Sequence, residues 1–154
     1  MSKTLFGDNS LSACPARGQG KYVIYTDGGA RGNPSPAAIG VVINSSAGIK
    51  KYGEKIGSTT NNVAEYTAVI FALKKLKLLV GKKDIKNAEA DFKLDSELAV
   101  KQLNGEYKVK EEGLQKLFME IWNLKLDLKK VSFMHIPREQ NKEADKLVNE
   151  ALDN

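Results

Sequence analysis

The spacing of hydrophobic residues changes several times between residue 21 and the C-terminus, and each change predicts a new element. Tyr22 to Asp27 is a short β-branched and aromatic run that ends at two glycines, as a buried strand does. Two more apolar segments, 39–43 and 49–56, meet across a small polar turn, and lysines alternate through the second. We therefore predict three strands, with Asp27 at the end of the first and 49–56 at a sheet edge, where lysines discourage further pairing.

The next segment has helical spacing. Thr59 or Thr60 suits the N-cap, and Gly81 suits the end of a helix that runs to about Leu79. The apolar positions that follow the helical period are Val63, Tyr66, Ile70, Phe71 and Leu78. One long helix is predicted here.

Alternation of apolar and charged residues returns at 90–94, which predicts a half-buried strand directly before Asp95. A short helix from about Ser96 to Leu103 follows it. A last strand over 131–136 is ended by Pro137.

Two helical stripes complete the pattern. The first has the cleanest helical spacing in the chain, and we expect its apolar positions in the core: Leu114, Leu117, Phe118, Ile121 and Trp122. The second is formed by Ala144, Leu147, Val148 and Ala151, and Asp145 borders it. The predicted order is β-β-β-α-β-α-α-β-α, an α/β fold.

Composition narrows the class. The chain has 154 residues, 42% of them hydrophobic, the size of one domain, and we assign it to 21–154 after a flexible leader at 1–20. Cys14 is the only cysteine, which with no signal peptide predicts a reducing, cytoplasmic location. The longest apolar run is too short for a membrane helix. We expect a soluble monomer with no membrane partner.

Charge adds one weak indication. A net charge of +5 favours a polyanionic partner, although many ordinary domains are equally basic.

Four carboxylates stand apart from the acids that lie among lysines. Asp27 and Asp95 each follow an apolar strand, at the edge where open α/β sheets bind ligands. Glu65 and Asp145 lie early in two predicted helices, which can bring them to the same edge. Taken singly, each of these two is more simply a carboxylate that complements the helix dipole. Together, clustered carboxylates repel one another unless a cation neutralises them, and hard oxygen ligands select Mg²⁺ or Mn²⁺.

The decisive resemblance rests on four ordered blocks: Tyr25-Thr26-Asp27-Gly28-Gly29-Ala30-Arg31-Gly32-Asn33-Pro34, Thr60-Asn61-Asn62-Val63-Ala64-Glu65-Tyr66, Leu94-Asp95-Ser96-Glu97-Leu98, and His135 to Asp145. Their order and spacing resemble type 1 ribonuclease H from about Lys21 to Leu152. The resemblance implies a ribonuclease H-like fold, a five-stranded mixed sheet whose first three strands are antiparallel, flanked by helices. It also implies an endonuclease that cuts the RNA strand of RNA/DNA hybrids with little sequence preference.

Carried over position by position, the resemblance makes the four carboxylates the catalytic ligands of two Mg²⁺ ions, with Mn²⁺ possible: Asp27, Glu65, Asp95 and Asp145. Asp27 and Asp95 are then expected to bridge both ions. His135 matches the family's mobile-loop histidine, ten residues before the last acid, and an imidazole there can shuttle a proton or assist product release. A lone histidine is by itself more often structural.

Substrate contacts follow from the same blocks. Gly28 and Gly29 permit positive φ angles and close approach of a nucleic-acid backbone, although a tight strand exit explains them equally. The amides of Asn33, Asn61 and Asn62 suit 2′-hydroxyls, which would distinguish RNA from DNA.

Two other functions stay open. One is a hybrid-binding accessory module that keeps the fold without turnover, and the presence of all four acids and His135 argues against it. The other is a DNA-directed nuclease of the same superfamily, which the histidine block and the Asn61-Asn62 pair disfavour.

Overall fold

The computed structural model describes residues 20–154, and the predicted leader lies outside these residues apart from Gly20. The strands of the described part are β1 Lys21–Ala30, β2 Ser35–Ser45, β3 Gly48–Thr59, β4 Glu89–Leu94 and β5 Lys130–His135. Its helices are α1 Asn61–Val80, α2 Glu97–Leu103, α3 Glu112–Lys125 and α4 Lys142–Asp153, with 3-10 turns η1 Ile85–Asn87 and η2 Arg138–Gln140. The predicted order of strands and α-helices is confirmed.

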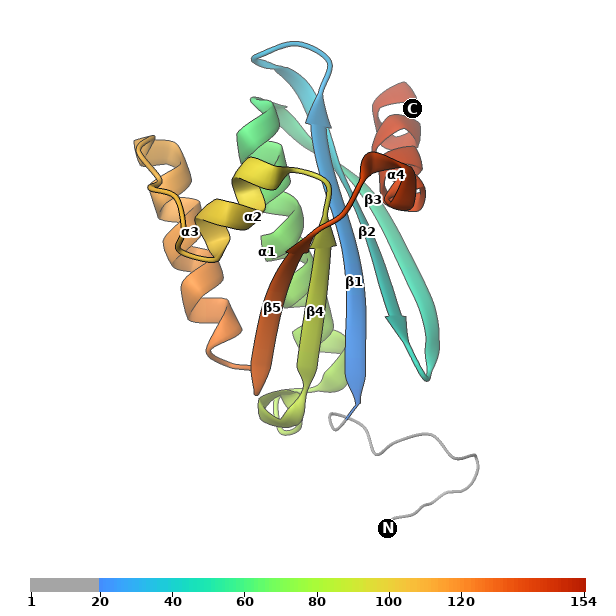
Figure 1. The fold of residues 1–154 in the computed structure, drawn as a ribbon. Helices are drawn as coiled ribbons and strands as arrows, with labels where there is room; N and C mark the ends of the chain where they lie inside the picture. Colours follow the sequence, from blue (N-terminus) through green and yellow to red (C-terminus); the bar gives the residue numbers. More distant parts are fainter. Residues whose placement is uncertain (1–19) are drawn as a thin grey trace.

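The strands form one mixed sheet in the order β3-β2-β1-β4-β5 (Figure 1). β1, β2 and β3 pair antiparallel, whereas β4 is parallel to β1 and β5 is parallel to β4. This confirms the predicted five-stranded sheet, and β3 occupies an edge as its lysines indicated.

The prediction for the end of β1 is wrong. Asp27 lies inside the strand, because β1 continues to Ala30 and still pairs there with β2. On its other side, the pairing of β1 with β4 reaches only Tyr25 and Lys93. Asp27 therefore lies just past the point where the parallel pairing stops, and Asp95 directly follows β4.

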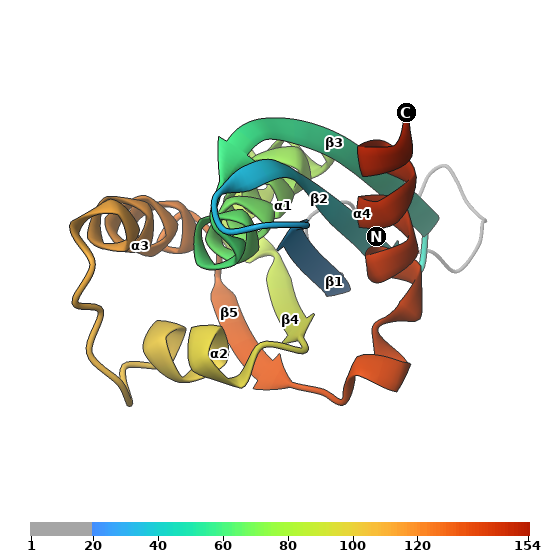
Figure 2. The same ribbon diagram turned by 90° about the horizontal axis from the view of Figure 1, so that it is seen from above.

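The helices cover the sheet from two sides. Seen from above, α1 and α3 lie on one side of the sheet and α4 on the other (Figure 2). Gly40 in β2 allows α4 to pack closely against the sheet, because a Cβ at this position would lie 2.1 Å from the carbonyl oxygen of Ala144 in α4. None of the helices in the described part is both long and apolar enough to cross a membrane.

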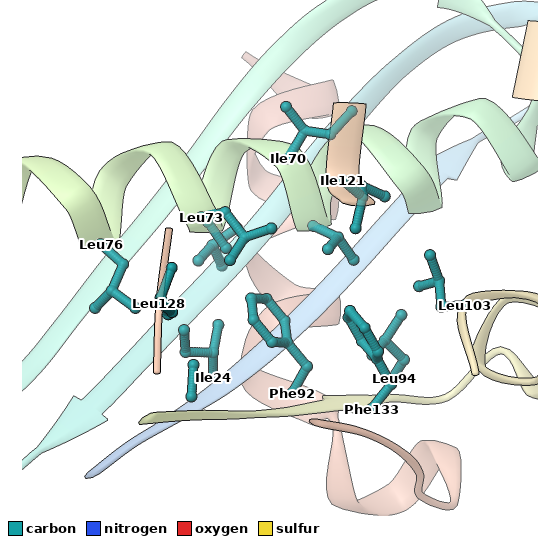
Figure 3. Close-up of a cluster of buried hydrophobic side chains, with 14 of the residues drawn as sticks. Ile24, Ile70, Leu73, Leu76, Phe92, Leu94, Leu103, Ile121, Leu128 and Phe133 are labelled. Atoms are coloured by element: carbon teal, nitrogen blue, oxygen red, sulfur yellow. The ribbon is translucent and has the colours of Figure 1, made fainter. Parts of the chain in front are cut away.

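The main core lies between α1, α3 and the sheet. Leu73 and Leu76 of α1 face Phe92 and neighbouring side chains of the strands (Figure 3). A smaller cluster of Ala38, Val148 and Ala151 lies under α4 on the opposite face.

One predicted core position is wrong, because Trp122 is 45% exposed although it fits the helical period of its segment. Leu78, which also fits the helical period of its segment, is 77% exposed. Each side chain lies on the solvent-exposed side of its helix, α3 for Trp122 and α1 for Leu78. Their hydrophobic character placed both residues in an apolar helical stripe. How much of such a stripe is buried depends on the neighbouring elements, which the spacing along the sequence does not reveal.

Candidate active site

Three of the four predicted acids converge where β1, β4 and α1 meet. Asp27, Glu65 and Asp95 each offer one carboxylate oxygen, and these oxygens lie within 4.8 Å of one another. Asp27 and Glu65 are buried, at 9% and 7% exposure, and Asp95 is half-buried. The cluster thus joins residues that are far apart in the sequence, Asp27 and Asp95 being 68 positions apart.

The start of α1 positions Glu65. The Thr60 hydroxyl caps the helix by accepting a hydrogen bond from the backbone N–H of Val63 at 3.3 Å, as predicted. One turn later, Glu65 Oε1 accepts a hydrogen bond from the backbone N–H of Gly28 at 2.7 Å. This bond ties Glu65 to the residue that follows Asp27.

Gly28 allows this approach for a steric reason. A Cβ at Gly28 would lie 2.2 Å from the backbone carbon of Ala64, so only glycine lets α1 come this close to β1. Neither Gly28 nor Gly29 uses the positive φ that glycine permits. The close approach at Gly28 is made by α1, on the side where a side chain would project.

Burial makes negative charge costly in this cluster. Desolvation raises the pKa of Asp27 far above its usual range, and the charges of Glu65 and Asp95 raise it further. Desolvation also raises the pKa of Glu65, although hydrogen bonds with Asp27 and the Gly28 N–H oppose the effect. Glu65 Oε2 is buried with no hydrogen-bond partner in the described part of the chain.

These features fit a divalent cation. The donors are carboxylate oxygens alone, which suits Mg²⁺ or Mn²⁺ better than zinc. A cation would provide a positive counter-charge for the buried carboxylates of Asp27 and Glu65. It would also provide a partner for Glu65 Oε2, which has no hydrogen bond in the described part of the chain.

The cluster forms part of an open groove of about 410 Å³. Besides the three clustered acids, the groove is lined by Gly28, Gly29, Ala30, Arg31, Asn61, Asn62, Ser96, Arg138, Asp145, Val148, Asn149 and Leu152. Gly28, Gly29, Asn61, Asn62 and Asp145 were predicted from the sequence. The groove therefore brings most of the predicted site residues to one surface.

Asp145 differs from the other acids. It lies in the first turn of α4, exposed to solvent, and it is not among the residues whose oxygens lie within 4.8 Å of one another. Its Oδ2 accepts a hydrogen bond from Asn149 Nδ2 at 3.4 Å, one turn further along the helix. Asp145 still raises the pKa of Asp27 through its charge.

Two predicted site residues are not brought into the groove. His135 ends β5 and is exposed, and Asn33 is exposed between β1 and β2, and neither residue lines the groove. Asn61 does line it, but its Oδ1 accepts a hydrogen bond from the Ala30 N–H at 2.8 Å. The NH₂ group of the Asn61 amide is then free of the Ala30 bond and can donate to a ligand.

The sequence reading missed two polar residues near the acids. Arg138 lines the groove, and its positive charge lowers the pKa of Glu65. Asn141 is 1% exposed and lies just before α4. Both belong to the block that ends at Asp145, but a helix-period analysis gives no signal for residues in the turn before a helix.

Comparison with known proteins agrees with this geometry. A family model described as reverse transcriptase-like matches residues 25–151. The chain is 38% identical over 136 residues to the bifunctional protein Rv2228c of Mycobacterium tuberculosis, covering 86% of this chain and 36% of that protein. It therefore spans about a third of the length of this curated relative.

Two further relatives match over more of their length. Ribonuclease HI of Halobacterium salinarum is 38% identical over 141 residues, which cover 90% of this chain and 67% of the relative. The structure of LC11-RNase H1, isolated from compost by a metagenomic approach, is 51% identical with a TM-score of 0.80 and covers 86% of this chain and 96% of its own. A second LC11-RNase H1 structure, 49% identical, contains an RNA/DNA hybrid. With these matches along nearly the whole domain and a TM-score of 0.80 to a solved relative, the chain belongs to the type 1 ribonuclease H family.

Proposed function

We propose that this chain is a metal-dependent endonuclease that hydrolyses the RNA strand of RNA/DNA hybrids, with little sequence specificity. The observation that carries the proposal is the convergence of Asp27, Glu65 and Asp95, with oxygens within 4.8 Å of one another, in an open polar groove. The substrate class is supported by the hybrid bound to LC11-RNase H1, a relative of similar fold.

In this proposal the cation ligands are Asp27, Glu65, Asp95 and Asp145, holding two Mg²⁺ ions or, alternatively, Mn²⁺. Asp27 and Asp95 are the acids proposed to contact both ions. When bound, such ions activate the attacking water and stabilise the leaving oxygen of a phosphodiester. Asp145 reaches the groove from the exposed side, so its carboxylate can adjust to a ligand more freely than the buried pair.

The polar residues around the acids would orient the substrate. Gly28, Gly29 and Asn62 line the groove, where backbone and amide groups can meet the sugar edge of an RNA strand. Asn61 would donate to a 2′-hydroxyl, because the bond from Ala30 to its oxygen orients the amide and leaves its NH₂ group for a ligand. Asn33 lies outside the groove lining and would act only if the 31–34 turn closes over bound nucleic acid.

Two basic residues complete the proposed chemistry. His135 would accept a proton from the attacking water or assist product release, acting from the end of β5. Arg138 lines the groove and offers a guanidinium to a phosphate oxygen.

We also propose that residues 21–154 form the catalytic domain and act as a monomer. A cytoplasmic location stays a prediction that rests on the single cysteine, Cys14.

One assay tests the function. The purified chain is incubated with labelled RNA/DNA hybrid, duplex DNA and duplex RNA, each with Mg²⁺, Mn²⁺ or chelator, beside the matched variant Asp95→Asn. The proposal predicts metal-dependent cleavage of RNA in the hybrid alone, and none by the variant. Binding without cleavage would instead indicate an accessory module, and cleavage of duplex DNA a DNA-directed nuclease.

A further inference from the structure

Asn141 is the buried residue that joins the separate parts of the acid site. It is 1% exposed and lies between η2 and the first residue of α4. Its side-chain amide donates to the backbone oxygen of Thr26 at 2.9 Å and to Asp95 Oδ2 at 3.3 Å. Thr26 directly precedes Asp27, so one amide contacts both β1 and the acid that follows β4.

The backbone of Asn141 makes a third connection. Its carbonyl oxygen accepts a hydrogen bond from the N–H of Asp145 at 3.1 Å, and its own N–H donates to the Arg138 oxygen at 2.9 Å. The residue therefore contacts the segments that carry Asp27, Asp95 and Asp145, which come from distant parts of the chain. No helix cap explains this placement, because the Asn141 side chain makes no capping bond to α4.

The chemistry of the position requires a donor. Thr26 offers a carbonyl oxygen and Asp95 offers a carboxylate oxygen, and both only accept hydrogen bonds. An amide NH₂ has two hydrogens and can serve both. An aspartate of the same shape would place a carboxylate against two acceptors and add a charge to the cluster.

We propose that Asn141 is a positioning residue that orients the Asp95 carboxylate for divalent-cation binding. The bond to Oδ2 would restrict rotation of the Asp95 carboxylate and so help it to hold a cation. Hydrogen-bonding partners of metal ligands typically contribute 10–100-fold to metal affinity. This inference rests on the proposed function only in assuming that the acids hold a cation, and it does not require hybrid cleavage.

The test measures Mn²⁺ binding by the full chain without nucleic acid, by isothermal titration calorimetry, for wild type, Asn141→Ala and Asn141→Ser. We expect Asn141→Ala to weaken Mn²⁺ binding by about 10–100-fold. Serine keeps one shorter donor and should recover part of the affinity. If the alanine variant does not fold, the serine variant carries the test.

A control separates positioning from loss of stability. Ile121→Ala removes a core side chain of α3 that is 1% exposed and does not line the groove, so it should lower Tm without changing Mn²⁺ affinity at a temperature where it is folded. Wild-type affinity in Asn141→Ala or Asn141→Ser, or no Mn²⁺ binding by the wild type, would overturn the inference. If Asn141→Ala binds Mn²⁺ more weakly than the wild type, but the wild type cuts no hybrid, only the proposed function would be overturned.

Discussion

The two halves of the acid site differ in how they meet solvent. The inner half, Asp27 and Glu65, is buried and tied to the meeting point of β1 and α1 through the Gly28 N–H. The outer half is exposed: Asp145 lies in the first turn of α4, and His135 lies at the end of β5, outside the groove lining. Asp95 lies between them, half-buried and held by Asn141. The comparison sets a buried pair, for which we propose a cation as counter-charge, against an exposed pair whose polar groups already meet water.

The largest effect is expected from Asp27→Asn. Loss of this inner carboxylate should reduce hybrid cleavage by more than about 100-fold. This exceeds the usual effect of losing a residue that only hydrogen-bonds to a metal ligand. Tm of the metal-free protein at neutral pH should rise, because burial of Asp27 requires its carboxylate to take up a proton or lose its hydration, and asparagine avoids this cost. Each kcal/mol of relief corresponds to roughly 2–4 °C. Gel assays and thermal melts in EDTA measure both. A variant that keeps most of its activity would remove Asp27 from the mechanism.

Gly28→Ala should disrupt the inner half through packing. The added methyl group would lie 2.2 Å from the Ala64 backbone, so α1 must move away from β1 and carry Glu65 with it. We expect a loss of at least about 1–3 kcal/mol in the free energy of unfolding, measured by urea denaturation. Gly29→Ala is the matched control, because its Cβ would make an ordinary 3.5 Å contact with Val148 Cγ1. Equal losses in the two variants would contradict the packing argument.

His135→Ala should slow hybrid cleavage without reducing cation binding at the acids. Acid–base groups commonly contribute at least about 100-fold, and we expect a decrease of this order in kcat with residual activity clearly above that of Asp27→Asn. Mn²⁺ affinity should stay at the wild-type level, because His135 does not line the groove. Steady-state kinetics beside calorimetry distinguish the two effects, and unchanged kcat would exclude the proton role.

Asp145→Asn should have a milder effect than the inner acids. Its side chain is exposed and outside the 4.8 Å cluster, so we expect about a tenfold loss of activity that higher Mg²⁺ partly restores. No rise of Tm is expected in EDTA, because an exposed charge has little desolvation to relieve. A loss as complete as that of Asp27→Asn would show that the outer half is as essential as the inner half.

The smallest effect is a pH dependence of stability in the metal-free protein. Folding raises the pKa of Asp27 and Glu65 above their ordinary values of 3.8 and 4.5. The stability these acids contribute is fully present below those values and is lost as pH rises through the folded-state pKa. Tm in EDTA should therefore fall from about pH 4 toward neutrality, and Mg²⁺ should reverse much of the fall. A Tm that does not respond to pH or Mg²⁺ would contradict the burial argument.

The sequence predicted the parts of the molecule that depend on local pattern. The strands, the Thr60 cap and the position of Asp95 after β4 follow from periodicity and turn chemistry, and all are observed. Trp122 and Leu78 show the limit, because a helical stripe does not reveal how much of it a neighbour covers.

The remaining site features arise only in three dimensions. The steric role of Gly28 depends on how closely α1 packs on β1, and the bonds of Asn141 join residues 115 and 46 positions away. Neither contact leaves a periodic signal along the chain.

The most direct test of the account is anomalous diffraction from crystals that contain Mn²⁺ and a non-cleavable RNA/DNA hybrid. We predict a manganese peak within about 2.5 Å of an oxygen of each of Asp27, Glu65 and Asp95, beside the RNA strand. A peak elsewhere, or fully bound hybrid with no manganese at these carboxylates, would contradict the account.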